Sequence, residues 1–101
     1  MKIVLLINTS NNEEIKVGIR IDKKEYEMRK KISSQKAQVL LPMIDRLLVK
    51  HSLKLRDIKS IEVNTKYGSF TGVRIGLSVA NALSFALKIP VKKYKLTKRN
   101  R

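Results

Sequence analysis

The spacing of the apolar residues changes along this chain, and that change limits the folds open to it. A continuous apolar run occupies residues 3–7, apolar and polar residues alternate at 15–21, and a weaker alternation follows at 25–32. A short continuous run suits a strand covered on both faces, whereas alternation suits a strand with one exposed face. Polar turn residues separate the three segments. The first third of the chain therefore predicts an antiparallel meander of three strands.

The spacing becomes helical after residue 32. Apolar residues three and four positions apart run from Ala37 to His51, and Ser33 or Ser34 is the expected N-cap. Pro42 lies inside this pattern, where its missing N–H should kink the helix or unsettle its first turns. One helix face cannot hold all the apolar side chains of this segment, so we expect part of the helix to stay uncovered.

Two more strands and a second helix complete the expected order. Residues 60–64 alternate as a strand, a glycine-rich turn at 68–72 opens a helix to about Lys88, and residues 91–96 resume as a strand. The order βββαβαβ predicts an α/β fold, a single ribonuclease-H-like half-domain whose mixed five-stranded sheet carries packed helices. The final strand–helix–strand unit should be a right-handed parallel crossover.

The charge balance is strongly basic. The 101 residues include 23 Lys and Arg against 8 Asp and Glu, which gives a formal net charge of +15. Such a chain attracts polyanions by counterion release, so nucleic acid, and tRNA in particular, is a plausible partner. The alternative is a lysine-rich surface that is simply solvated, and the scattered charge leaves both open. We expect one domain at residues 1–96 and a basic tail at 97–101.

Cysteine is absent, and no apolar run approaches the roughly 20 residues that a membrane-spanning helix needs. There is accordingly no disulfide framework and no thiolate metal site. We expect a cytoplasmic protein with no membrane partner.

Catalytic residue types are missing from the places where this fold would need them. Cleavage by two metal ions needs several acids at the ends of the first and fourth strands, and this chain carries Asn8 and Asn64 there. Asn8 also argues against a sugar-kinase or ATPase function. His51, the single histidine, is expected near a helix C-terminus, where it can meet free carbonyls. We therefore expect no catalytic residue, no metal site and no cofactor.

One uninterrupted motif carries a family resemblance. Residues 69–76 read Ser-Phe-Thr-Gly-Val-Arg-Ile-Gly, which resembles the glycine-rich signature of the TsaB/YeaZ family. Asn8-Thr9-Ser10 stands where that family usually has Asp-Thr-Ser, and the first helix has the family's internal proline, Pro42. The motif residues singled out are Gly68, Ser69, Phe70, Thr71, Gly72 and Arg74.

The resemblance covers about residues 1–95 and matches the N-terminal domain only of a family whose members are longer. It implies the actin/Hsp70/sugar-kinase superfamily fold and a non-catalytic scaffold role in N6-threonylcarbamoyladenosine (t6A) modification of tRNA. The implied partner is a TsaD-like protein, which carries the metal and the transfer chemistry, with a TsaE-like ATPase as a further component. Two alternatives stay open: a stand-alone basic tRNA-binding protein and a self-associating homodimer.

The family's partner surfaces lie on two helices, and the second helix has an unusual composition. Small residues recur there every four positions, at Gly72, Gly76, Ala80 and Ser84. Glycine inside a helix costs about 1 kcal/mol relative to alanine, and close approach of another backbone is the usual compensation. That backbone belongs either to a partner or to this chain's own first helix or sheet. The candidate interface residues are Gly72, Val73, Gly76, Leu77, Ala80, Asn81 and Ser84 on the second helix, and Val39, Leu40, Met43 and Leu47 on the first.

Contact with tRNA, if made, should be by phosphate attraction. The chain has 3 Tyr, 2 Phe and no Trp, and these aromatics do not alternate with basic residues, so base stacking is poorly supported. The candidate phosphate contacts are Arg74, Lys92, Lys93, Lys98 and Arg99.

Overall fold

The computed structural model describes residues 1–11, 13–32, 34–65 and 70–94. Its five strands form one sheet in the order β3-β2-β1-β4-β5, with β1–β2 and β2–β3 antiparallel and β1–β4 and β4–β5 parallel. The α/β class, the meander and the mixed five-stranded sheet are confirmed. The elements are β1 (Ile3–Asn8), β2 (Glu14–Ile21), β3 (Lys24–Lys31), α1 (Lys36–Lys50), the 3-10 turn η1 (Leu55–Asp57), β4 (Ser60–Asn64), α2 (Phe70–Leu87) and β5 (Val91–Tyr94).

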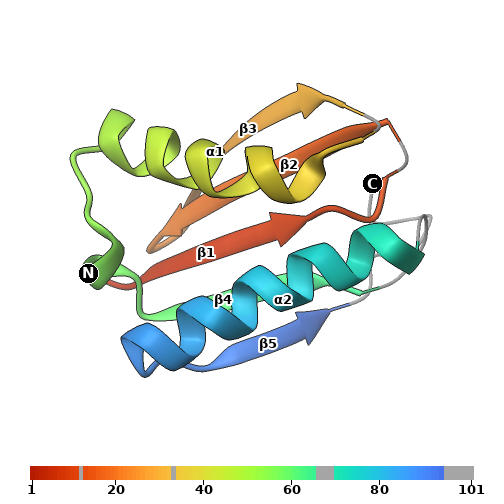
Figure 1. The fold of residues 1–101 in the computed structure, drawn as a ribbon. Coiled ribbons are helices and arrows are strands. Elements are labelled where there is room, and N and C mark those ends of the chain that lie inside the picture. Colours follow the sequence, from red (N-terminus) through yellow and green to blue (C-terminus); the bar gives the residue numbers. More distant parts are fainter. Residues whose placement is uncertain (12, 33, 66–69, 95–101) are drawn as a thin grey trace.

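The apolar run makes β1 the central strand. Leu5 pairs with Ile19 of β2 and with Ile61 of β4, and all three side chains are fully buried. Figure 1 shows α1 and α2 side by side over one face of the sheet, α1 beside β2 and β3 and α2 above β1 and β4. The core lies between this helical layer and the sheet.

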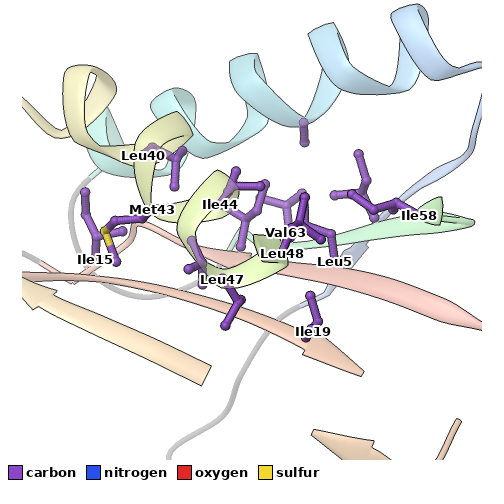
Figure 2. Packing of buried hydrophobic residues seen from close by; sticks show 14 residues of the cluster. Leu5, Ile15, Ile19, Leu40, Met43, Ile44, Leu47, Leu48, Ile58 and Val63 are labelled. Carbon is purple, nitrogen blue, oxygen red and sulfur yellow. The ribbon is translucent and has the colours of Figure 1, made fainter. Parts of the chain in front are cut away.

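Helix α1 supplies much of that core. Figure 2 shows Leu40, Met43 and Leu47 pointing from α1 toward the sheet, among other buried side chains. Their exposed fractions are 0%, 4% and 2%. The expectation that these three residues face a partner is therefore corrected, because they are the side chains by which α1 packs on its own sheet. Val39, the fourth candidate on this helix, is half-buried.

The start of α1 differs from the expected one. The helix begins at Lys36, and its N-cap is Gln35, whose φ of 59° places the backbone in the left-handed region, with no side-chain cap bond. Ser34 is therefore not the N-cap, and Ser33 lies outside the described residues. The helix continues through Pro42 to Lys50. Proline inside a helix removes one backbone hydrogen bond and can kink the helix without ending it.

The described part of the chain stops within the expected last strand. Strand β5 is described to Tyr94, so the end of the expected strand at 91–96 and the expected tail at 97–101 lie outside the described residues. Within the described ranges, no helix has the length and apolarity to cross a membrane.

Two adjacent leucines in α1 test this packing. Leu40→Ala should lower the free energy of unfolding by about 2–5 kcal/mol, because it leaves a cavity in the core. Leu41→Ala should lower it by less than about 1 kcal/mol, because Leu41 is 49% exposed. Urea unfolding of both variants measures the difference. Equal losses would contradict the placement of α1.

Candidate functional site

The inner face of α2 approaches β1 closely. A Cβ at Gly72 would overlap the carbonyl oxygen of Thr9, and a Cβ at Gly76 would lie 2.5 Å from the Thr9 Oγ1. The Thr9 hydroxyl donates a hydrogen bond to the carbonyl oxygen of Gly72. These contacts explain the two glycines, because a larger residue at either position would prevent α2 from lying this close to Thr9 of the same chain.

The rest of the small-residue ridge follows the same face. Ala80 is fully buried against the core, and the Ser84 hydroxyl donates to the carbonyl oxygen of Ile89, in the connection to β5. The alternative in which the ridge packs on this chain's own sheet is what the structure shows. Gly72, Gly76 and Ala80 are therefore not available on the surface of this chain.

A junction of amides and hydroxyls joins the ends of β1 and β4. The Asn8 Oδ1 accepts bonds from the Ser10 backbone N–H at 3.1 Å and from the Ser10 hydroxyl at 2.7 Å. The buried Asn64 completes the junction, with its Nδ2 donating to the Ser10 Oγ at 3.0 Å. The two asparagines that stand in place of acids thus hold strand ends together.

Lys36 adds a buried cation beside this junction. It is 6% exposed, and its ammonium group donates to the backbone carbonyls of Thr9, at 3.3 Å, and Asn11. Burial lowers the pKa of Lys36 below its usual value. A Cβ at Gly72 would also lie 3.3 Å from the Lys36 Nζ, so the amine sits where α1, α2 and the loop after β1 meet. These contacts tie the first residue of α1 to the loop after β1.

The bonds described at this junction join neutral amides, hydroxyls, backbone carbonyls and one ammonium group, with no carboxylate among them. Nowhere in the described ranges do three or more His, Asp or Glu side chains gather as a metal site would need. His51 is placed as expected, with its Nδ1 3.0 Å from the carbonyl oxygen of Leu47 at the end of α1.

The outer face of α2 has a different composition. Exposed along it are Ser78, Asn81, Ala82 and Phe85, and Phe85 is 88% exposed. Between Phe70 and Leu87 the only charged residue is Arg74, although 31% of the whole chain is charged. A helix surface that is exposed yet nearly free of charge is unusual in so basic a chain.

Helix α1 adds exposed apolar side chains to this layer, with the exposed charged residues Asp45 and Arg46 between them in the sequence. Leu41 and Val49 are 49% and 66% exposed on α1, which lies beside α2 on the same face of the sheet (Figure 1). We name the exposed residues Leu41, Val49, Ser78, Asn81, Ala82 and Phe85 the helical surface. Of the expected interface residues, Asn81 is exposed, while Val39, Val73, Leu77 and Ser84 remain half-buried.

The remaining motif and phosphate-contact residues are scattered. Thr71 and Arg74 are exposed on the first turns of α2, and Lys92 and Lys93 are exposed on the edge strand β5. Phe70 begins the helix. The other candidates, Gly68, Ser69, Lys98 and Arg99, lie outside the described residues.

The sequence analysis missed an ionic network on the second face of the sheet. Arg20 bridges Glu62 of β4 at 2.6 Å and Glu25 of β3 at 3.3 Å, and Arg29 bridges Glu27 at 3.0 Å. These side chains line an open hollow of about 360 Å³. The alternation of apolar and polar residues in β2 could have predicted where this network lies, because the polar positions of the strand must share the face opposite the core.

Tyr94 closes one side of the same hollow. Burial raises the pKa of its phenol, and the nearby Glu62 and Glu25 carboxylates add to the rise. The phenol therefore stays neutral around pH 7.

Comparison with known proteins agrees with this geometry. A family model described as "TsaD: tRNA N6-adenosine threonylcarbamoyltransferase" matches residues 29–93. The "tRNA threonylcarbamoyladenosine biosynthesis protein TsaB" of Buchnera aphidicola subsp. Schizaphis graminum is 32% identical over 89 residues, which are 88% of this chain and 42% of the relative. The protein of the same name from Buchnera aphidicola subsp. Baizongia pistaciae is 32% identical over 90 residues, 89% of this chain and 40% of the relative.

A solved structure shows the same likeness. YeaZ from Pseudomonas aeruginosa matches with a TM-score of 0.85 and 33% identity, covering 94% of this chain and 43% of that one. The family model and the relatives carry different names. We assign the family from the relatives, because they match nearly the whole chain. This chain spans about two fifths of the length of these relatives.

Adjacent residues in the first turn of α2 test the close approach to β1. Gly72→Ala should lower the free energy of unfolding by at least about 1–3 kcal/mol, although alanine favours helix, because its methyl group overlaps the Thr9 carbonyl. Thr71→Ala, at an exposed position, should be neutral or slightly stabilising. Thermal unfolding compares the two variants. A stabilised Gly72→Ala protein would show that this face of α2 is open.

Proposed function

The chain belongs to the TsaB/YeaZ family, and we propose that it is a non-catalytic partner subunit in N6-threonylcarbamoyladenosine modification of tRNA. In this role it docks on a TsaD-like catalytic subunit through the helical surface. The names of the relatives place those proteins in this biosynthesis, and the family model is that of the transferase itself.

The observation that carries the proposal is the neutral outer face of α2. Protein interfaces are depleted in charge at their centre and enriched in aromatic side chains. The outer face has both properties, with Phe85 as its exposed aromatic and no charge between Arg74 and Lys88. Solvated surfaces elsewhere on this chain show the opposite composition. On β3, seven of the eight residues are exposed, and six of those seven are Lys, Arg or Glu.

Phe85 is the expected anchor of this contact. Full burial of a phenylalanine side chain is worth about 1.5–3 kcal/mol relative to leaving it in water. Leu41 and Val49 on the neighbouring helix add apolar area to the same layer. A single aromatic surrounded by small and neutral residues is typical of a binding hot spot.

The junction at the strand ends supports the non-catalytic part of the proposal. The side chains of Asn8 and Asn64 hydrogen-bond to Ser10, and the Lys36 ammonium group donates to backbone carbonyls. General acid–base work needs a titratable group placed to exchange a proton with a substrate. The groups here connect β1, β4 and both helices instead, so the chemistry would be left to the partner.

A homodimer would use the same helical surface and is the nearest alternative. A stand-alone tRNA-binding protein is the second, and the net charge of +15 favours it. Ionic strength separates the partner subunit and the homodimer from the tRNA-binding protein. The affinity for a polyanion falls steeply with salt, whereas the affinity of a contact that buries a neutral surface changes little.

The docking surface can be tested with one substitution and one control. Phe85→Ser should weaken binding to the TsaD homologue from the same source by roughly 30-fold, as expected for loss of a hot-spot residue. Leu55→Ser removes an apolar side chain that is 41% exposed in η1, away from the helical surface, and should leave binding unchanged. Size-exclusion chromatography with light scattering and titration calorimetry, at moderate and high salt, measure both.

Three outcomes would count against the proposal. A chain that never binds the TsaD homologue would contradict the partner role. A Phe85→Ser protein with full affinity would place the contact elsewhere. A homodimer that survives high salt and is abolished by Phe85→Ser, with no mixed complex, would assign the surface to self-association.

A further inference from the structure

Exposed lysines lie along one end of the sheet, where four of its strands begin. Lys24 begins β3, Lys2 precedes β1, Lys59 precedes β4 and Lys88 lies in the turn before β5. All four side chains are exposed. The strands β1, β3, β4 and β5 begin at the same end of the sheet (Figure 1). The four lysines, each at or just before one of these strand starts, therefore lie in a row that follows the order β3, β1, β4, β5.

Backbone hydrogen bonds fix the neighbours in this row. The Asp22 N–H, in the turn before Lys24, bonds the Lys2 carbonyl at 3.0 Å, and the Lys59 N–H bonds the Ile3 carbonyl at 2.8 Å. The Ile61 N–H bonds the Pro90 carbonyl at 3.0 Å, which joins the turn after Lys88 to β4. Strands lie about 4.8 Å apart, so a row across five strands spans about 20 Å.

Helix α1 brings two more cations to the same end. Its last residue is Lys50, and Lys54 follows in the connection to β4, both exposed. The Tyr26 and His51 rings, with centroids 4.5 Å apart, hold this helix end beside β3. We name Lys2, Lys24, Lys50, Lys54, Lys59 and Lys88 the basic edge.

Two acids at this end, Asp22 and Asp57, bond backbone N–H groups and are outnumbered by the six lysines of the basic edge. Asp22 accepts a bond from the Lys2 backbone N–H at 3.1 Å, and Asp57 accepts one from the Lys54 backbone N–H at 2.8 Å. The ion pairs found among the described residues join Arg20 and Arg29 to glutamates on the open sheet face. The chain thus concentrates its paired charges on one surface and leaves a row of lysines on another.

We propose that the basic edge binds the phosphate backbone of a structured RNA. A row about 20 Å long can face several phosphates of one strand, which follow one another every 3.4 Å or so along a helical axis. Lysine ammonium groups on flexible stems suit phosphate contact without base reading. This site lies at the opposite end of the strands from the first turns of α2, which carry Arg74.

An RNA is favoured over an anionic membrane surface on two grounds. Membrane-surface helices present a broad apolar face beside their cations, whereas the exposed apolar side chains near the basic edge, Met1, Val49, Leu55 and Phe85, come from four separate segments and form no stripe along one helix among the described residues. The second ground rests on the proposed function, which concerns tRNA. The binding itself depends on the charges alone and does not need the partner subunit.

The test measures binding of an unmodified tRNA transcript to the chain alone, by fluorescence anisotropy over a range of salt concentrations. One variant combines Lys2→Gln, Lys24→Gln and Lys59→Gln. A matched control combines Lys30→Gln, Lys31→Gln and Arg46→Gln, which removes the same number of exposed charges from other surfaces. Vesicles containing phosphatidylserine serve as the second probe. Circular dichroism and thermal unfolding confirm that both variants are folded, and binding to the TsaD homologue is measured separately.

The basic-edge variant should bind tRNA at least tenfold more weakly at low salt, with the slope of log K against log salt reduced by about 3. The control should change affinity by less than threefold. Equal losses in the two variants, or none in either, would overturn the proposal. So would vesicle binding that depends on the basic edge when tRNA binding does not. Because partner binding is measured separately, these results leave the partner role standing or falling on its own.

Discussion

The close approach of α2 to β1 is the contact on which the rest of this structure depends. Gly72 and Gly76 let the helix backbone come within bonding distance of Thr9, whose hydroxyl is tied to the Gly72 carbonyl. That contact sets the depth of α2 on the sheet, and the Lys36 ammonium group ties the start of α1 to the same Thr9 carbonyl. With both helices seated by their inner faces, their outer faces are determined as well.

Three surfaces of different chemistry result from this arrangement. The outer face of α2 carries one charged residue, Arg74, the open sheet face carries charges that are paired, as in the bridge between Arg20 and Glu62, and the basic edge carries lysines beside acids that bond backbone amides. A net charge of +15 says nothing about such a division. The two contacts proposed above would use different residues, although the two surfaces meet where Val49 precedes Lys50 on α1.

Much of the fold follows from the sequence, because the change from strand spacing to helical spacing is strong and the motif at 69–76 is unbroken. The side that the small-residue ridge faces could not be read in the same way, since a period of four is equally suited to a partner and to the chain's own sheet. Leu40 and Leu41 are alike in type and adjacent, and only the packing of α1 separates a core residue from a surface one. The lysines of the basic edge come from five separate segments of the chain, so no pattern of neighbouring residues in the sequence predicts that they lie together.

The central claim is that the inner face of α2 holds the fold together while its outer face meets the partner. The most direct measurement is an amide NMR spectrum of the isotope-labelled chain, recorded during titration with the TsaD homologue from the same source. The account predicts that resonances of Ser78, Ala82 and Phe85 on α2, and of Leu41 and Val49 on α1, change first and most. Changes centred on the open sheet face around Arg20 and Glu62, with α2 unaffected, would contradict it.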